Sequence, residues 1–327
     1  MKDKRIKVRI WLTAAAVLAV LGALISWYGR KKEEERTLDI VLIQKAMDDT
    51  DFWTSMYQGG EMAAAEYNAE IRVLGPEREQ EADRQNEMIL EAIEEKPDAV
   101  VLAPCSSSET LPYARRIEEA GIRLILVDST MEEEAGEAVI STDNFEIGYK
   151  MGEYMRKFVR KDTVIGIVGH VEGSSTALGR EEGFRAGLQD EEKRVAEIVF
   201  CSSDTEKATE LTKELLERHP DMNMIVGLNE YSAVGAARAV KELGLEKEIR
   251  MAGIDSSEEE IQLLEEGIFE ALVVQKPFNM GYLSVETAVR LVRGEKTEKI
   301  QNSGSALITK ETMYTEENQK LLFPVDE

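Results

Sequence analysis

The 327-residue sequence has few of the residues on which disulfide frameworks and metal sites depend. It holds two cysteines, Cys105 and Cys201, and two histidines, His170 and His219. Two cysteines are too few for a disulfide scaffold or a zinc cluster. His219 precedes a proline at the expected end of a helix, where a cation suits the helix dipole, and we interpret His170 as a loop residue. We therefore expect no metal site and no cofactor.

Positive charge is scarce outside the first 36 residues. The whole chain carries 40 Lys and Arg against 64 Asp and Glu, a formal net charge of −24. Residues 1–36 hold nine basic and four acidic residues, so the remaining 291 residues hold 31 and 60, a net of −29. Such an acidic body repels phosphate backbones, which bind through Lys and Arg. Nucleic acid is therefore excluded as a partner.

The common catalytic motifs are also missing. The sequence has no G-x-x-x-x-G-K-[ST], no G-x-G-x-x-G after a strand, no G-x-S-x-G and no H-E-x-x-H. Residues 48–51 (DDTD) lack the central glycine and terminal glutamate of an EF-hand loop. We therefore expect a binding protein without catalytic residues. A glycosidase that uses Asp128 and Asp255 as paired carboxylates stays open as a remote alternative.

One long apolar run is present, near the N-terminus. Ile10 to Tyr28 is a run of 19 residues, which as a helix spans about 28 Å, enough to cross a hydrocarbon core. Trp11 and Trp27 lie near its ends, where aromatic rings favour the membrane interface, and five basic residues precede it. Residues 1–36 are therefore predicted to form a cytoplasmic tip, an uncleaved transmembrane signal anchor and a short stalk. A cleaved signal peptide is the alternative.

From residue 38 onward, apolar runs alternate with amphipathic stretches. Strands are predicted at 38–43, 70–74, 98–103, 122–128, 138–142, 163–169, 194–200, 222–228, 249–255 and 269–275, with helices among others at 51–68, 82–95, 145–160, 204–218, 231–243 and 279–293. Continuous Val, Ile and Leu runs indicate strands covered on both faces, as in parallel sheets. The rhythm breaks near 129–143, which favours two separate α/β sheets over one.

Polar side chains stand where several of these strands end. In open parallel sheets, ligands bind beyond the carboxyl ends of the strands. Asp128 and Asp255 each close a strand, Asn229 follows one, and Gln275 ends another. Carboxylates accept hydrogen bonds from hydroxyls, amides both donate and accept, and aromatic faces cover the C–H faces of a ring. This mixture favours a neutral, polyhydroxylated ligand.

The order of these motifs resembles the type I periplasmic sugar-binding proteins, the ribose-binding group in particular. The similar segments are 51–53 (DFW), 59–64 (GGEMAA), 96–104 (KPDAVVLAP), 120–128 (AGIRLILVD), 141–148 (STDNFEIG), 180–184 (REEGF), 219–221 (HPD), 228–236 (LNEYSAVGA), 252–255 (AGID) and 275–281 (QKPFNMG). Each segment alone is a weak signal, but together they run in the family order through about residues 38–313.

The resemblance implies two Rossmann-like lobes, each with a parallel sheet, joined by three hinge strands. Lobe 1 would comprise residues 37–142 plus 276–303, and lobe 2 residues 143–275 plus 304–327, with the ligand bound between them as they close. Crossings between the lobes would fall near 142–144, 275–277 and 302–305. The resemblance thus also accounts for the short strand predicted at 138–142.

The resemblance also implies roles for individual residues. Asp128 matches a carboxylate that accepts two sugar hydroxyls, and Arg180 matches an arginine that donates to sugar oxygens. The predicted ligand-binding set is Thr50, Phe52, Trp53, Asp128, Ser129, Thr142, Arg180, Ser203, Asn229, Asp255 and Gln275. Phe52 and Trp53 match an aromatic pair that sandwiches the sugar ring.

Four positions depart from the ribose binders. Thr50 and Ala103 stand where these have asparagines, Ser129 replaces an arginine, and Ser203 replaces a stacking aromatic. A buried group left without its partner costs about 1–3 kcal/mol, so such changes normally accompany a different ligand. The scaffold is therefore expected to be retained and the ligand to differ from ribose.

We expect an extracytoplasmic protein that captures a sugar-like solute and delivers it to a membrane-embedded ABC permease. The alternative is a partner that presents the bound ligand to a sensor histidine kinase. In either role the body is expected to be monomeric and held at the cell membrane by a single pass through the lipid bilayer at residues 10–28.

Overall fold

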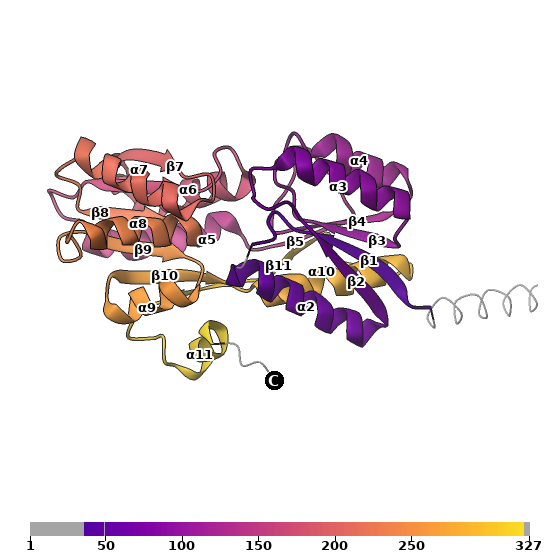
Figure 1. Ribbon diagram of the computed structural model, residues 1–327. Coiled ribbons are helices and arrows are strands. Elements are labelled where there is room, and N and C mark those ends of the chain that lie inside the picture. The colour runs from indigo at the N-terminus through magenta and orange to yellow at the C-terminus, as the bar shows by residue number, and fades with distance from the viewer. Residues whose placement is uncertain (1–35, 49, 324–327) are drawn as a thin grey trace, which may run out of the picture.

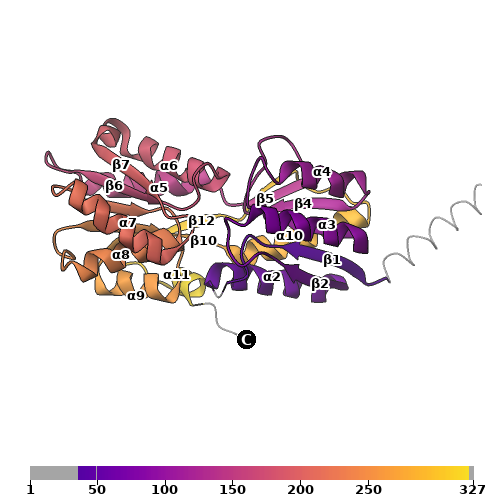
Figure 2. The same ribbon diagram turned by 45° about the horizontal axis from the view of Figure 1, so that its top comes forward.

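The protein folds into two α/β lobes that lie side by side (Figures 1 and 2). The computed structural model describes residues 36–48 and 50–323. The expected anchor at 10–28 lies outside these residues. Within the described ranges, no helix is long and apolar enough to span a membrane.

Lobe 1 is built on a six-stranded sheet in the order β11-β5-β4-β3-β1-β2, with parallel pairing between neighbours. Its strands are β1 (Leu38–Ile43), β2 (Ala69–Leu74), β3 (Ala99–Leu102), β4 (Arg123–Val127), β5 (Ala138–Ser141) and β11 (Ile300–Asn302). Its helices are α2 (Asp51–Tyr67), α3 (Ala82–Glu95), α4 (Leu111–Glu119) and α10 (Pro277–Val292).

Strand β1 explains why the apolar runs of lobe 1 are continuous. Ile40 and Leu42 pack with side chains of α2 and α10 on one face of the sheet, whereas Val41 and Ile43 pack with side chains of α3 and α4 on the other. Because successive side chains of a strand point to opposite faces, a strand covered on both sides needs apolar residues at every position.

Lobe 2 is built on a second six-stranded sheet, in the order β12-β10-β9-β8-β6-β7. Its strands are β6 (Ile165–Gly169), β7 (Val195–Phe200), β8 (Met224–Gly227), β9 (Arg250–Ile254), β10 (Phe269–Gln275) and β12 (Ser305–Ile308). Its helices are α5 (Asn144–Met155), α6 (Ser175–Leu188), α7 (Thr205–Arg218), α8 (Glu230–Glu242), α9 (Glu258–Glu266) and α11 (Glu316–Leu322), with 3₁₀ turns at Arg156–Phe158 and Gln189–Arg194.

The predicted all-parallel sheets are wrong for one pair, since β12 runs antiparallel to β10. The chain leaves lobe 2 at the carboxyl end of β10 and returns to lobe 2 beside the same end through β12. A strand that enters where its neighbour leaves must run in the opposite direction. Gln275 accordingly pairs with Ser305, the last residue of one strand against the first of the other.

The chain passes between the two sheets three times: between β5 and α5, between β10 and α10, and between β11 and β12. The first and third passages are tied together, because the hydroxyls of Thr142 and Ser303 lie 3.0 Å apart and both residues are buried. Gly304 follows with φ +83, a left-handed backbone that favours glycine. The first and third passages thus lie beside one another between the two lobes.

Within lobe 1, α2 and α10 approach so closely that their glycines meet backbone atoms. A Cβ atom added to Gly59 would lie 2.0 Å from the Phe278 carbonyl oxygen, and one added to Gly281 would lie 1.8 Å from that of Met56. No side chain fits such a gap. Helix α10, from late in the chain, is therefore held against α2, the first helix of the described chain.

Candidate ligand site between the lobes

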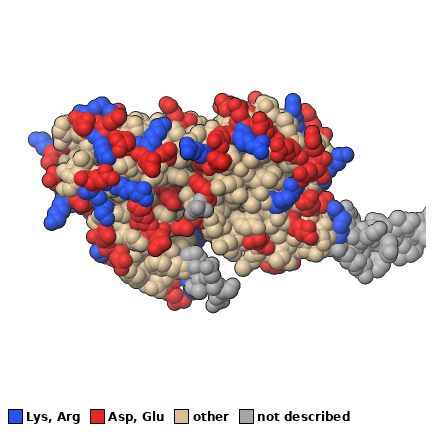
Figure 3. All heavy atoms as spheres, in the orientation of Figure 1, with Lys and Arg blue, Asp and Glu red and all other residues tan. Residues whose placement is uncertain are grey.

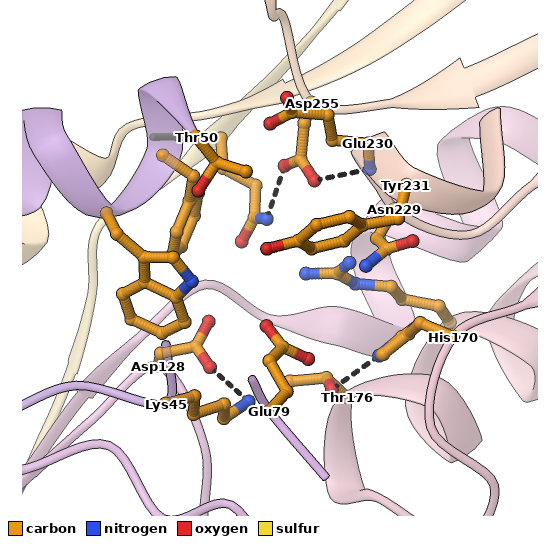
Figure 4. A pocket seen from close by; sticks show the side chains of 14 residues that line it. Lys45, Thr50, Glu79, Asp128, His170, Thr176, Asn229, Glu230, Tyr231 and Asp255 are labelled. Carbon is orange, nitrogen blue, oxygen red and sulfur yellow. Dashed lines mark hydrogen bonds and ion pairs between the residues drawn. The ribbon is translucent and has the colours of Figure 1, made fainter. Parts of the chain in front are cut away.

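A pocket lies between the lobes, at the carboxyl ends of strands from both sheets (Figure 4). Its lining residues are Lys45, Thr50, Phe52, Trp53, Glu79 and Asp128 from lobe 1 and His170, Thr176, Arg180, Asn229, Glu230, Tyr231, Asp255 and Gln275 from lobe 2. Ligands of open α/β sheets bind beyond the carboxyl ends of the strands, and this pocket lies at such ends in both lobes.

Eight of the eleven residues proposed from the sequence line this pocket: Thr50, Phe52, Trp53, Asp128, Arg180, Asn229, Asp255 and Gln275. The structure therefore brings together residues that are up to 225 positions apart in the chain, between Thr50 and Gln275. Their contact with a ligand stays a prediction, now supported by a common location.

The other three residues do not line the pocket. Ser129 donates its hydroxyl to Asp128 at 2.9 Å, Thr142 lies at the first passage between the lobes, and Ser203 donates to Glu79 at 2.6 Å. Their hydroxyls are engaged with neighbouring protein groups. They support pocket residues or the hinge, and a direct ligand contact is not needed to account for them.

Lys45 and Asp128 form a buried ion pair on the lobe 1 wall. Lys45 lies two residues beyond β1, Asp128 directly follows β4, and the lysine nitrogen is 2.6 Å from the carboxylate. Burial by itself would raise the pKa of Asp128, but the charge and hydrogen bond of Lys45, together with Arg180 and the Ser129 hydroxyl, outweigh it and hold that pKa below its usual value. Ser129 stands where the ribose binders have an arginine, so in this protein Lys45 supplies the cation beside Asp128.

Both strand-end carboxylates adopt a left-handed backbone, with φ +63 at Asp128 and +95 at Asp255. Residues other than glycine adopt such angles at a cost, which asparagine and aspartate bear best. Unfavourable backbone angles of this kind gather at binding sites, where the surrounding structure holds them.

Glu79 is a further pocket residue, and it lies in the loop between β2 and α3. It is 9% exposed and accepts the Ser203 hydroxyl of lobe 2 at 2.6 Å. Burial raises its pKa even though Lys45 lies near enough to oppose the shift. Sequence reasoning missed Glu79 and Lys45. The loop after β2 is also a strand end, so the rule that selected Asp128 could have selected Glu79.

On the lobe 2 wall, Arg180 of α6 is fixed by two hydrogen bonds. Its Nε donates to the Asn144 side chain and its Nη1 to the Leu228 carbonyl, each at 2.8 Å. Within the described chain its Nη2 has no protein acceptor, and Arg180 lines the pocket. The guanidinium is therefore positioned in advance, with one nitrogen left to donate to a ligand.

Asp255 lies between an amide and a helix N-terminus. Gln275 donates to one carboxylate oxygen at 2.7 Å and the Glu230 backbone N–H to the other at 3.1 Å. Burial raises the pKa of Asp255. Burial, followed by the charge of Asp255, raises the pKa of Glu230 to about 8. A pKa of about 8 leaves Glu230 mostly protonated at neutral pH, so the two neighbouring carboxyl groups of this corner are not both ionised.

Asn229 and His170 present polar atoms to the pocket. The Asn229 side-chain oxygen caps α8 by accepting from the Ser232 N–H at 3.0 Å, which leaves its amide nitrogen for other partners. His170 Nε2 bonds the Thr176 hydroxyl at 2.8 Å, and burial lowers the pKa of His170 well below its usual value. His170 is therefore neutral, and its Nδ1 is buried without a partner among the described residues.

The aromatic residues are arranged differently from the predicted sandwich. Phe52 and Trp53 both lie on α2, and their rings meet edge to face, with centroids 4.9 Å apart and an interplanar angle of 88°. Two perpendicular rings on one helix cannot cover both faces of one sugar. The ring of Tyr231 lies in the pocket from lobe 2 (Figure 4), so it is the better placed second aromatic.

Several hydrogen bonds cross from one lobe to the other around the pocket. Tyr231 donates its hydroxyl to Asp48, the Glu258 N–H donates to Asp51 at 3.2 Å, and Ser203 bonds Glu79 as described. These contacts require both lobes to be close together. The structure therefore describes the closed arrangement, with the pocket covered by both lobes.

The fold and the pocket define a two-lobed solute-binding protein, and comparison with known proteins agrees. Residues 40–296 match the family described as periplasmic binding protein domain, and the chain belongs to this family. It is 44% identical to a solved structure described as a sugar transporter from Clostridium phytofermentans, which covers 84% of this chain and 100% of that one with a TM-score of 0.80.

Two other relatives extend the comparison. An ABC transporter solute-binding protein from Agrobacterium vitis, solved with bound D-fucose, is 27% identical over 87% of this chain and 100% of that one, with a TM-score of 0.84. A D-ribose/D-allose-binding protein from Pseudomonas aeruginosa is 22% identical over 295 residues, 88% of this chain and 92% of the relative. The resemblance to sugar-binding relatives seen in the motifs is confirmed.

Proposed function

We propose that this chain is an extracytoplasmic solute-binding protein that captures a sugar or sugar-like polyhydroxylated molecule by lobe closure, for import by an ABC permease. The observation that carries the proposal is the pocket itself, whose walls come from the strand ends of both lobes. A ligand that bonds both walls stabilises the closed arrangement by its greater affinity for that state.

The chemistry of the walls supports a polyhydroxylated ligand. Asp128 and Asp255 accept hydrogen bonds, Arg180 and Asn229 have donors to spare, and aromatic rings supply flat surfaces. Each hydroxyl of a sugar both donates and accepts, so it matches walls on which donors and acceptors are mixed. Relatives named for sugar binding and import support the same ligand class and the import role.

Import is favoured over the two alternatives. The family consists of substrate-binding proteins, so Asp128 and Asp255 are treated as ligand-binding carboxylates and not as a catalytic pair. The relatives described above are named for binding and transport, which favours a permease over a sensor kinase as the membrane partner. The body is proposed to act as a monomer.

Purified residues 37–327 are expected to be stabilised by at least one sugar in a thermal-shift screen of D-ribose, D-allose, D-arabinose, D-fucose and D-tagatose. A ligand present at about 100 times its Kd adds about 2.7 kcal/mol of stability. Arg180→Met should weaken binding of that sugar by about 2 kcal/mol, because a charge-assisted hydrogen bond is lost.

The control for Arg180→Met is Arg84→Met on the exposed face of α3, where the affinity should not change. Circular dichroism shows whether each variant is folded. Binding that survives Arg180→Met unchanged would remove this residue from the site. Stabilisation by no sugar, with the protein shown to be folded, would contradict the proposed ligand class.

We further propose that residues 10–28 remain attached as a single-pass membrane anchor, so that the binding body faces the extracytoplasmic side. The apolar run, the aromatic residues at its ends and the basic residues before it support this. Mass spectrometry of the mature protein from its native host should therefore detect peptides from residues 1–36. A mature N-terminus between about residues 27 and 36 would instead indicate a cleaved signal peptide.

A further inference from the structure

The buried walls of the pocket do not balance in charge. Five ionisable side chains, each about nine-tenths buried or more, line it: Lys45, Glu79, Asp128, Arg180 and Asp255. These are three carboxylates against two cations, and His170 adds no charge because its pKa is held well below neutral. One carboxylate is therefore in excess.

The excess carboxylate is Glu79. Asp128 has its cation in Lys45 at 2.6 Å. Asp255 and Glu79 each have one cation nearby that opposes the rise of their pKa, Arg180 and Lys45 respectively, but both oxygens of Asp255 accept hydrogen bonds, from Gln275 and from the Glu230 N–H. Within the described chain, Glu79 forms no ion pair, and its one hydrogen bond comes from the neutral Ser203 hydroxyl at 2.6 Å.

A ligand in the pocket can reach the carboxylate of Glu79. Its carboxylate points into the pocket beside Asp128 and Lys45, across from Asp255 and Tyr231 (Figure 4). One oxygen, Oε2, is occupied by Ser203, whereas Oε1 has no hydrogen-bond donor among the described residues. A buried carboxylate without a cation is costly, so a ligand that brought a positive charge to it would be favoured.

The residues at the mouth of the pocket are also acidic. Asp48 and Asp51 of lobe 1 lie against Tyr231 and Glu258 of lobe 2, through the Tyr231–Asp48 contact and the 3.2 Å bond from the Glu258 N–H to Asp51. Asp48 and Asp51 are close enough to add to the rise of the pKa of Glu230, after burial and Asp255. Acidic side chains, interspersed with basic ones, are spread over both lobes on the face shown in Figure 3. Such a field attracts cations, repels anions and leaves neutral solutes unaffected.

We propose that the ligand is an amino-substituted sugar or polyol whose ammonium group binds the free oxygen of Glu79, while its hydroxyls bond the remaining walls. This inference rests on the proposed sugar-binding function and narrows its ligand class. Anionic sugars, such as phosphorylated sugars and uronates, are excluded by the same charge balance. The short Ser203, in place of a stacking aromatic, leaves the Glu79 side of the pocket polar.

The test uses sets of three probes that differ at one position: D-galactosamine, D-galactose and N-acetyl-D-galactosamine, with the corresponding sets for glucose and mannose. Isothermal titration calorimetry of the folded body should find, in at least one set, that the amine binds about tenfold or more tightly than its neutral parent and its N-acetyl derivative. Glu79→Gln keeps the shape and the Ser203 contact but removes the charge, so it should abolish the preference.

Glu87→Gln, an exposed carboxylate on α3, is the matched control and should leave the preference intact. Neutral sugars that bind more tightly than their amines would overturn the inference and leave the proposed function standing. The absence of binding by amines and by neutral sugars alike would overturn both.

Discussion

Asp128→Ala is expected to abolish sugar binding and to destabilise lobe 1 at the same time. The carboxylate lies at the pocket wall and is the partner of Lys45, which is only 4% exposed. Breaking a buried ion pair by removing one partner typically costs about 3–5 kcal/mol, because the other charge stays buried and uncompensated. The pKa of Asp128 is lowered in the folded state, so its contribution is present above about pH 4 and is lost as the pH falls further.

A double variant separates the two effects. Asp128→Asn with Lys45→Met removes both charges and should recover most of the stability that Asp128→Ala loses, yet it should still fail to bind sugar. Urea unfolding measures the first effect and calorimetry the second. If Asp128→Ala were to unfold at the same urea concentration as the wild type, the buried pair would not contribute as the geometry indicates.

Gly59→Ala is expected to lower the free energy of unfolding by about 2 kcal/mol or more, although alanine normally favours a helix over glycine by about 1 kcal/mol. The added methyl group would lie 2.0 Å from the carbonyl oxygen of Phe278, so α2 and α10 must move apart. Because α10 also closes one face of the lobe 1 core, separation of the helices exposes apolar surface.

Gly60→Ala, at the next position of the same helix, is the matched control. Its methyl group would meet the Ile71 Cδ1 atom at 2.9 Å, the end of a side chain that can rotate. We expect the free energy of unfolding to change by less than about 1 kcal/mol for this variant. Equal losses for Gly59→Ala and Gly60→Ala, measured by urea unfolding, would show that the helix spacing does not depend on Gly59.

Most of the fold could be predicted because its strands are buried on both faces. The ten predicted strands all exist, with limits that differ by at most two residues at each end, and the predicted first strand coincides with β1, Leu38–Ile43. The helix expected at 145–160 is shorter, since α5 ends at Met155 and continues as a 3₁₀ turn. The apolar runs did not reveal the short strands β11 and β12, and only the resemblance pointed to this region, as a passage between the lobes near 302–305.

Site residues that directly follow an apolar strand could be predicted. Residues that lie further along a loop and pair with a distant part of the chain were missed. Asp128 and Asp255 could be selected from their positions alone. Lys45 and Glu79 also lie in loops that follow strands, but two and five residues beyond the strand ends, and lysine and glutamate on a loop are normally exposed. Their burial depends on packing between loops that follow β1 and β2 and on Ser203 from the other lobe, which no local pattern records.

The close contact between α2 and α10 also has a consequence for the order in which the protein can form. A chain emerging from a ribosome releases α2 more than 200 residues before α10, counting from Tyr67 to Pro277. Until then, the places that Met280, Val285 and Ala288 fill in the lobe 1 core are empty. Lobe 2 strands β6 to β10 are made in between, so the lobe whose synthesis begins later can complete its parallel core first. Lobe 1, although it begins first, waits for nearly the whole chain.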